Sequence, residues 1–132
     1  MATTNASISI DSPDIIPGSL MNYYKATTLH KAGKCEGLTQ IQSGSAGYTS
    51  TSTVELLDES VVTEDGANKL WVKNMSTDTT EYFTIYIQSE ELGRLYAQDW
   101  MFIPWSGGSS NNIQVAPSVA SAMKLEYVLV YE

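Results

Sequence analysis

Apolar side chains recur at every second residue along several stretches of this chain, and no other feature of the sequence constrains its fold more. In "EYFTIYIQS" (residues 81–89), Phe and two Ile point one way while Tyr, Thr and Tyr point the other. In "KLEYVLVYE" (residues 124–132) the odd positions are Leu, Tyr, Leu and Tyr, and "YTSTSTVELL" (residues 48–57) also alternates. Successive side chains of a β-strand point to opposite faces of a sheet, so this period predicts strands.

The remaining strand candidates are short and are separated by turn-forming residues. They comprise residues 7–11, 21–29, 38–42, 69–75, 92–98, 100–105 and 113–116. We expect the segment 69–75 to pair with 81–89 across the polar turn "STDTT". Seven to nine short strands at this spacing predict an all-β fold, an antiparallel β-sandwich that is jelly-roll-like.

The length of 132 residues suits one domain preceded by an arm. The first twenty residues contain Pro13, Pro17 and Gly18 without helical periodicity, and proline cannot donate a hydrogen bond to a sheet ladder. We therefore expect residues 1–20 to form an extended N-terminal arm and residues 21–132 to form a single β-sandwich domain. The glycine-rich segment from residue 30 to 47 is interpreted as a long loop with at most one short strand.

The segment "DWMFIPW" (residues 99–105) is apolar on both of the faces that a strand would present. Trp100 and Trp105 differ by five positions, so on a regular strand they point to opposite faces. One face would fill the core, and the other would be covered by the arm or by a partner. An exposed apolar patch normally marks an interaction site, so we expect a self-association interface. Its candidate residues are Ile8, Ile10, Ile15, Ile16, Trp100, Phe102 and Trp105.

The charge balance excludes one class of partner. The formal net charge is −8, the sequence pI is near 4.4, and only seven residues are Lys or Arg. Nucleic-acid binding requires clustered basic side chains that displace counterions from phosphates, so we expect no nucleic-acid partner. Residues 58–132 hold most of the negative charge. This half would suit a positively charged partner surface, although net charge also keeps a soluble β-protein from associating.

The sequence lacks the motifs of catalysis and of metal binding. His30 is the single histidine and Cys35 the single cysteine, and no nucleophile or nucleotide motif surrounds either residue. The acidic residues between 58 and 65 do not have the spacing of a calcium loop. We therefore expect no enzyme activity, no cofactor and no metal. Without a signal peptide or a run of ~20 apolar residues, we expect synthesis in the cytoplasm and no membrane partner.

Three segments of the second half follow one another in a recognisable order: "LWVKNMSTDTTEYFTIYI", "LGRLYAQDWMFIPWSG" and "MKLEYVLVYE". A Lys-Asn strand end leads through a polar turn into a hydrophobic strand, an aromatic segment ends in Ile-Pro, and a strand with Glu-Tyr and aliphatic residues closes the chain. In this order the chain resembles small all-β virion structural proteins of tailed bacteriophages. The resemblance covers roughly residues 69–132.

The resemblance implies a non-enzymatic virion component that is made in the host cytoplasm. It favours a capsid decoration (cement) protein that binds the lattice of the major capsid protein, with the neck, the tail or a fibre as other positions. It also implies a homo-oligomer, and the local three-fold positions of a capsid favour a trimer. The alternative is a carbohydrate-binding β-module of a phage fibre or spike, which would recognise a host surface glycan through exposed Trp and Tyr.

Overall fold

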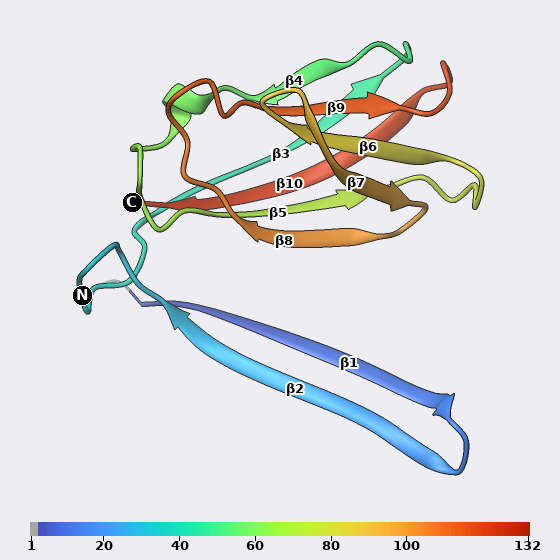
Figure 1. Cartoon of the computed structure of the whole chain (residues 1–132), viewed down its shortest axis with the longest axis horizontal. Helices are drawn as coiled ribbons and strands as arrows, with labels where there is room; N and C mark the ends of the chain where they lie inside the picture. Colours follow the sequence, from blue (N-terminus) through green and yellow to red (C-terminus); the bar gives the residue numbers. More distant parts are fainter. Residues whose placement is uncertain (1–2) are drawn as a thin grey trace.

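The computed structural model of the chain describes residues 3–132, apart from the side chains of Ile15 and Ile16, and folds into a β-sandwich with a separate β-hairpin (Figure 1). A single 3-10 turn, η1 at Glu59–Val61, lies between β4 and β5. The strands are β1 (Thr4–Ile16), β2 (Ser19–Leu29), β3 (Gln40–Tyr48), β4 (Val54–Leu57), β5 (Lys69–Asn74), β6 (Tyr82–Ile87), β7 (Glu90–Tyr96), β8 (Trp100–Pro104), β9 (Ile113–Pro117) and β10 (Met123–Tyr131).

The order of the strands in the two large sheets is that of a jelly roll. One sheet runs β3–β10–β5–β8 and faces the other, which runs β4–β9–β6–β7. Neighbouring strands pair antiparallel throughout. Among these eight strands, only the β6–β7 connection stays within one sheet, and every other connection crosses to the opposite sheet. Eight strands wound in this way form a double-sheet jelly roll. The predicted all-β, jelly-roll-like sandwich is therefore confirmed.

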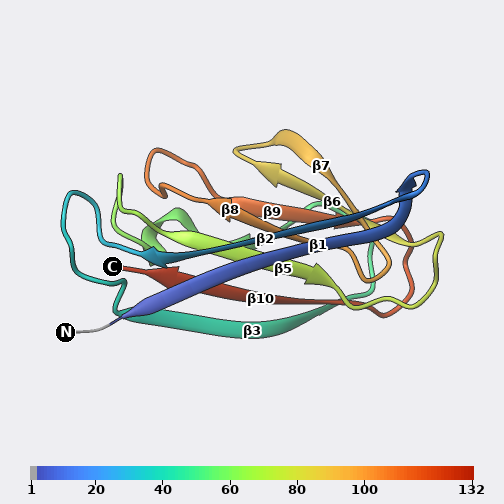
Figure 2. The ribbon, with the colours of Figure 1, turned by 90° about the horizontal axis from the view of Figure 1, so that it is seen from below.

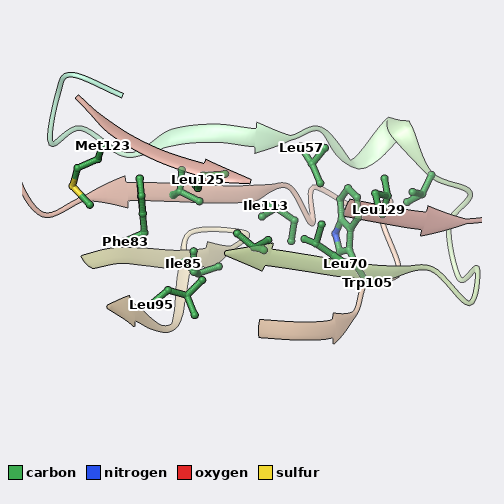
Figure 3. Packing of buried hydrophobic residues seen from close by; sticks show 13 residues of the cluster. Leu57, Leu70, Phe83, Ile85, Leu95, Trp105, Ile113, Met123, Leu125 and Leu129 are labelled. Atoms are coloured by element: carbon green, nitrogen blue, oxygen red, sulfur yellow. The ribbon is translucent and has the colours of Figure 1, made fainter. Parts of the chain in front are cut away.

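The core lies between the two sheets and follows from the alternation in the sequence. In β5, every second side chain points inward, and Leu70 and Val72 have no exposed surface. Phe83 and Ile85 of β6, in the opposite sheet, belong to the same buried cluster (Figure 3). The buried cluster comprises Leu57, Val62, Leu70, Val72, Phe83, Ile85, Leu95, Trp105, Ile113, Val115, Met123, Leu125 and Leu129.

The predicted pairing of 69–75 with 81–89 is wrong. Both segments are strands, but β5 pairs with β10 and β8, whereas β6 pairs with β7 and β9 in the other sheet. The polar turn between them carries the chain across the sandwich. Alternation shows which residues face the core, but both sheets of a sandwich contribute an apolar inner face. The pattern alone does not assign a strand to one sheet.

The segment from residue 40 to 57 also differs from the prediction. The glycine-rich part forms β3, and the expected strand at 48–57 is reduced to Val54–Leu57. Position 44 in β3 requires glycine, because a Cβ atom there would come within 2.8 Å of the Tyr127 ring. Downstream, the Ser50 hydroxyl accepts a hydrogen bond from the backbone N–H of Ser52 at 3.3 Å. Such local bonds compete with a strand ladder.

The N-terminal arm is a long hairpin rather than a single extended segment. Strands β1 and β2 pair over most of their length, and Gly18 adopts a left-handed φ of 77° in the turn. The register shifts between Ser12 and Ile16, where Pro13 lies, as expected for a residue that cannot donate to the ladder. The predicted boundary at residue 20 is therefore wrong, because β2 belongs to the hairpin and the sandwich begins after Leu29.

A buried asparagine stands at each end of β5 and ties the loops to the sandwich. Asn74 has no exposed surface, and its Nδ2 donates to the Leu95 carbonyl at 3.0 Å. Its Oδ1 accepts from the backbone N–H of Ser76 at 2.9 Å. At the other end, Asn68 is equally buried and donates to the Thr63 carbonyl at 3.3 Å.

We expect Asn74→Ala to lower the free energy of unfolding by about 1–3 kcal/mol, because the buried Leu95 carbonyl and the Ser76 amide each lose a partner. Urea denaturation followed by tryptophan fluorescence measures the change. Asn22→Ala, at an exposed position of β2, is the control and should leave the midpoint nearly unchanged. Equal losses for the two variants would contradict the role given to Asn74.

Candidate interaction surface

The outer face of the β3–β10–β5–β8 sheet is apolar at its centre. Because Leu70 and Val72 point inward, Trp71 between them points outward. The register places Trp71 between Val128 of β10 and Phe102 of β8. Trp100 lies two residues further along β8 on the same face, beside Lys73. The side chains of Trp100 and Phe102 are 47% and 42% exposed.

The hairpin, which we define as residues 4–29, has two unlike faces. Ala6, Ile8 and Ile10 alternate on one face of β1, opposite Thr27, Lys25 and Tyr23 of β2. The other face is more polar, with the Thr28 hydroxyl donating to the Asn5 side chain at 3.0 Å and the Ser9 hydroxyl donating to Asp11 at 2.9 Å. We call the face with Ile8 and Ile10 the inner face, because it borders the sandwich.

A groove of about 850 Å³ separates the hairpin from the outer face of the sheet. Figure 1 shows the hairpin diverging from β8 toward its turn, and Figure 2 shows it lying across β5, β8 and β10. The hairpin and the sheet therefore diverge as the two sides of a wedge do, with the wider end at the turn of the hairpin. Its walls are mainly apolar, and they comprise Ala6, Ser7, Ile8, Ile10, Lys25, Ala26 and Thr27 of the hairpin with Trp71, Trp100, Met101, Phe102 and Val128 of the sheet.

The segment between hairpin and sandwich, residues 30–39, forms a neck with a defined structure. Leu29 and Leu38 are buried at its base, and the Leu38 N–H donates to the Leu29 carbonyl at 3.1 Å. The Thr4 hydroxyl donates to the Leu38 carbonyl at 2.6 Å, which joins β1 to the same point. An isolated bridge between His30 and Gly37 closes the intervening loop. These contacts join the base of the hairpin to the neck.

Glu132 fastens the neck to the sandwich. One carboxylate oxygen accepts hydrogen bonds from the backbone N–H of Ala67 at 2.8 Å and of Ala32 at 3.2 Å. These bonds hold the pKa of the Glu132 carboxyl below its usual value, with the Ala67 bond the larger cause. An ion pair between Lys31 and Glu36, at 3.7 Å, lies within the same loop.

Four of the predicted interface residues line the groove together: Ile8 and Ile10 from the hairpin, and Trp100 and Phe102 from the sheet. The side chains of Ile15 and Ile16 lie outside the described part of the structure. The prediction that Trp105 belongs to the interface is wrong, because its side chain is only 3% exposed and belongs to the core. Its indole N–H donates to the Asn111 carbonyl at 2.8 Å. The expectation that Trp100 and Trp105 point to opposite faces is confirmed, and it is this alternation that removes Trp105 from the surface.

Sequence reasoning missed two residues at the centre of the groove wall, Trp71 and Val128. The alternation of side chains predicts that such residues point away from the core. Trp71, for example, lies between the inward residues Leu70 and Val72. What the sequence did not reveal is that β10 and β8 flank β5. Only this register brings Val128, Trp71 and Phe102 into one row.

The outer face of the opposite sheet carries a second aromatic cluster. The rings of Tyr82 and Tyr96 lie 5.1 Å apart, and the Arg94 guanidinium lies 4.6 Å from the centre of the Tyr82 ring. This contact is a cation–π interaction of an exposed pair. Because Arg94 already occupies the Tyr82 ring, the cluster does not present two free ring faces for stacking.

A smaller polar cleft of about 380 Å³ lies between residues 75–81 and 121–124. Glu81 is its central charged side chain. The carboxylate of Glu81 accepts hydrogen bonds from the Ser76 hydroxyl and, at 2.9 Å, from the Ser121 hydroxyl. These bonds join two loops, so the arrangement serves to hold the end of the sandwich.

Within residues 3–132, no group of three or more His, Cys, Asp or Glu side chains is placed to hold a metal ion. His30 and Cys35 are both exposed in the neck. None of the helical structure in this part of the chain is long and apolar enough to cross a membrane. Comparisons of the chain with protein-family models, with curated proteins and with solved structures find no match.

Trp100, at the start of β8, and Trp105, directly after its end, provide a matched pair of variants. Trp105→Ala should lower the free energy of unfolding by about 3–5 kcal/mol, because it empties part of the core. Trp100→Ala should change it by less than about 1 kcal/mol, because that side chain contacts the open groove. Guanidinium denaturation of both variants measures the difference. A Trp100 variant as unstable as the Trp105 variant would contradict the assignment of the two faces.

The neck should respond to acid through Glu132. A carboxyl whose pKa is lowered in the folded state contributes stability above its unfolded pKa, and this contribution is lost as the pH falls through the folded pKa. We expect the amide proton resonances of Ala32 and Ala67 to shift together with an inflection below the usual Glu pKa of about 4.3. In Glu132→Gln the inflection should vanish at both amides. Its persistence would assign the titration to another group.

Proposed function

We propose that this chain is a non-enzymatic structural protein of a tailed-bacteriophage virion, and that it decorates the capsid by binding the major capsid protein lattice as a homo-oligomer. The observation that carries the proposal is the hairpin held off a rigid jelly roll, with an apolar groove between them. The resemblance of residues 69–132 to small virion proteins supplies the class of assembly.

The distribution of apolar surface supports an assembly role. A sandwich needs one apolar face on each sheet, yet β8 is apolar on its outer face as well, and β5 adds the outward Trp71. Trp100, Phe102, Ile8 and Ile10 are all more than one-third exposed, and they converge on one groove. Contiguous apolar surface of this kind marks protein–protein contacts, and aromatic residues are enriched in them.

The polar content of the groove favours protein over sugar as the ligand. A carbohydrate-binding β-module of a fibre or spike would use the exposed Trp100 and Phe102 for stacking. It would also need hydrogen-bonding side chains for the sugar hydroxyls, and Ser7, Lys25 and Thr27 are the polar lining residues among those described. Recognition of glycans is thus the second candidate, and it becomes an outcome of the test below.

The proposal is tested on virions of the phage whose genome encodes the chain. Mass spectrometry of density-banded particles should detect the chain in a fixed ratio to the major capsid protein. Purified chain should then bind particles that lack it, and the double variant Trp100→Ser, Phe102→Ser should bind at least tenfold more weakly. Leu92→Ser, at an exposed position on β7 of the other sheet, is the control and should bind normally.

Two results would overturn the proposal. Particles that lack the chain altogether would exclude a virion role. Saturable binding to a glycan array, lost in the same double variant and retained in Leu92→Ser, would instead establish the carbohydrate-binding alternative.

A further inference from the structure

We propose that the groove receives the hairpin of a second copy of this chain, so that neighbouring copies exchange hairpins within a closed assembly. The inference rests on the homo-oligomer of the proposed function and names its contact surface. It does not depend on the capsid, and its test uses the purified chain alone.

The hairpin needs further packing to be stable, and a second copy would provide it. A two-stranded hairpin without further packing is marginally stable at best in water. Strands β1 and β2 pair with each other and with no strand of the sandwich. On the inner face, Ile8 and Ile10 remain 37% and 45% exposed across the groove from the sheet. An additional layer in the groove would bury this face and the opposite wall at once.

In the structure the hairpin stands off the sheet, and the neck links it to the sandwich. The bonds of Thr4 and Leu38, with the buried Leu29, hold the base of the hairpin. The Glu132 bonds to Ala32 and Ala67 hold the loop above it. The Ala32–Glu132 bond joins the neck to the sandwich, so rotation of the hairpin and neck onto β8 would break it. The hairpin diverges from β8 toward its turn (Figure 1), so an occupant would enter from that side.

The hairpin of another copy is long enough to lie along the facing sheet. Its strands of 11 and 13 residues extend over about 36–43 Å at ~3.3 Å per residue. The longest strand of the facing sheet that lines the groove, β10, has nine residues and extends over about 30 Å. A hairpin also offers two faces, one for each wall. Its inner face is apolar, and Tyr24 and Ala26 contribute apolar surface to the other face.

Charge favours this occupant and this face. The outward positions of β5 and β10 carry Lys69, Lys73 and Lys124 against Glu126, although the whole chain has a net charge of −8. The half of the hairpin nearest its turn carries Asp11 and Asp14 and no basic residue between positions 11 and 24. Copies that repel one another elsewhere would therefore attract where a hairpin approaches this sheet.

Exchange of hairpins between copies gives a closed assembly. Each copy offers one hairpin and one groove, so a pair, or a ring of three, satisfies every groove and leaves no hairpin free. Strand β8 forms an edge of its sheet, and Pro104 removes a donor from that edge. Growth by strand addition along β8 is therefore disfavoured.

The test replaces Phe102 by the photoreactive amino acid p-benzoyl-phenylalanine and mixes equal amounts of 15N-labelled and unlabelled chain before irradiation. We expect cross-linked peptides that join position 102 to residues 4–29, about half of them containing one labelled and one unlabelled partner. Cross-links confined to a single copy would overturn the inference, because the hairpin would then close on its own sheet. A lack of cross-links to residues 4–29 would overturn it equally.

Sedimentation of matched variants provides the second readout. Wild-type chain at tens of micromolar should sediment as a closed dimer or trimer, and Ile8→Asp, Ile10→Asp should shift the monomer–oligomer midpoint at least tenfold higher. Leu92→Asp, on the other sheet, should leave it unchanged. A monomeric wild type would refute hairpin exchange. Oligomers with normal cross-links but no binding to capsids would instead refute the proposed function and leave the exchange intact.

Discussion

The structure depends first on the two buried asparagines that bracket β5. Asn68 and Asn74 have no exposed surface, yet their side chains are hydrogen-bonded to the Thr63 and Leu95 carbonyls. A buried amide without partners is costly, so these bonds fix where β5 begins and ends and how the adjoining loops cross the sandwich. The main chain takes part as well, since the Trp105 N–H donates to the Asn68 carbonyl and the Gln98 N–H donates to the Asn74 carbonyl. With β5 fixed, β10 and β8 find their register on either side of it.

Strand β5 then links the core to the groove. Its inward residues Leu70 and Val72 belong to the core, and its outward residue Trp71 stands in the row with Val128 and Phe102. A shift of the register by one residue would turn Trp71 inward and expose Leu70, because side chains alternate strictly along a strand. The core therefore specifies the interaction surface. The large apolar content of "DWMFIPW" has the same explanation, since one half of it fills the sandwich and the other half lines the groove.

Local pattern predicted the strands but not their partners. The alternation of residues 81–89 and 124–132 identified β6 and β10. The parity of Trp100 and Trp105 placed them on opposite faces but did not show which of the two belongs to the core. Gly44 was interpreted as part of a loop, although glycine is required there by the ring of Tyr127, which is 83 residues away in sequence. The pairing of β5 with β10 rather than with its sequence neighbour is likewise a non-local choice. The hairpin was hidden by Pro13, which suggests a break in a strand and in fact marks the shift of register.

The groove also places much of the apolar surface outside the core between two walls of the same chain. In the free protein the two apolar walls face each other, and the more polar side of the hairpin, with Asn5, Ser9 and Asp11, is turned to solvent. The net charge of −8 opposes contact between the remaining surfaces. Neither wall is a flat exposed patch that would bind apolar surfaces without selectivity. A proposed partner would instead enter between the two walls, which the neck connects through Leu38 and the Ala32–Glu132 bond. Specificity in such an arrangement comes from the shape that the neck imposes rather than from any single side chain.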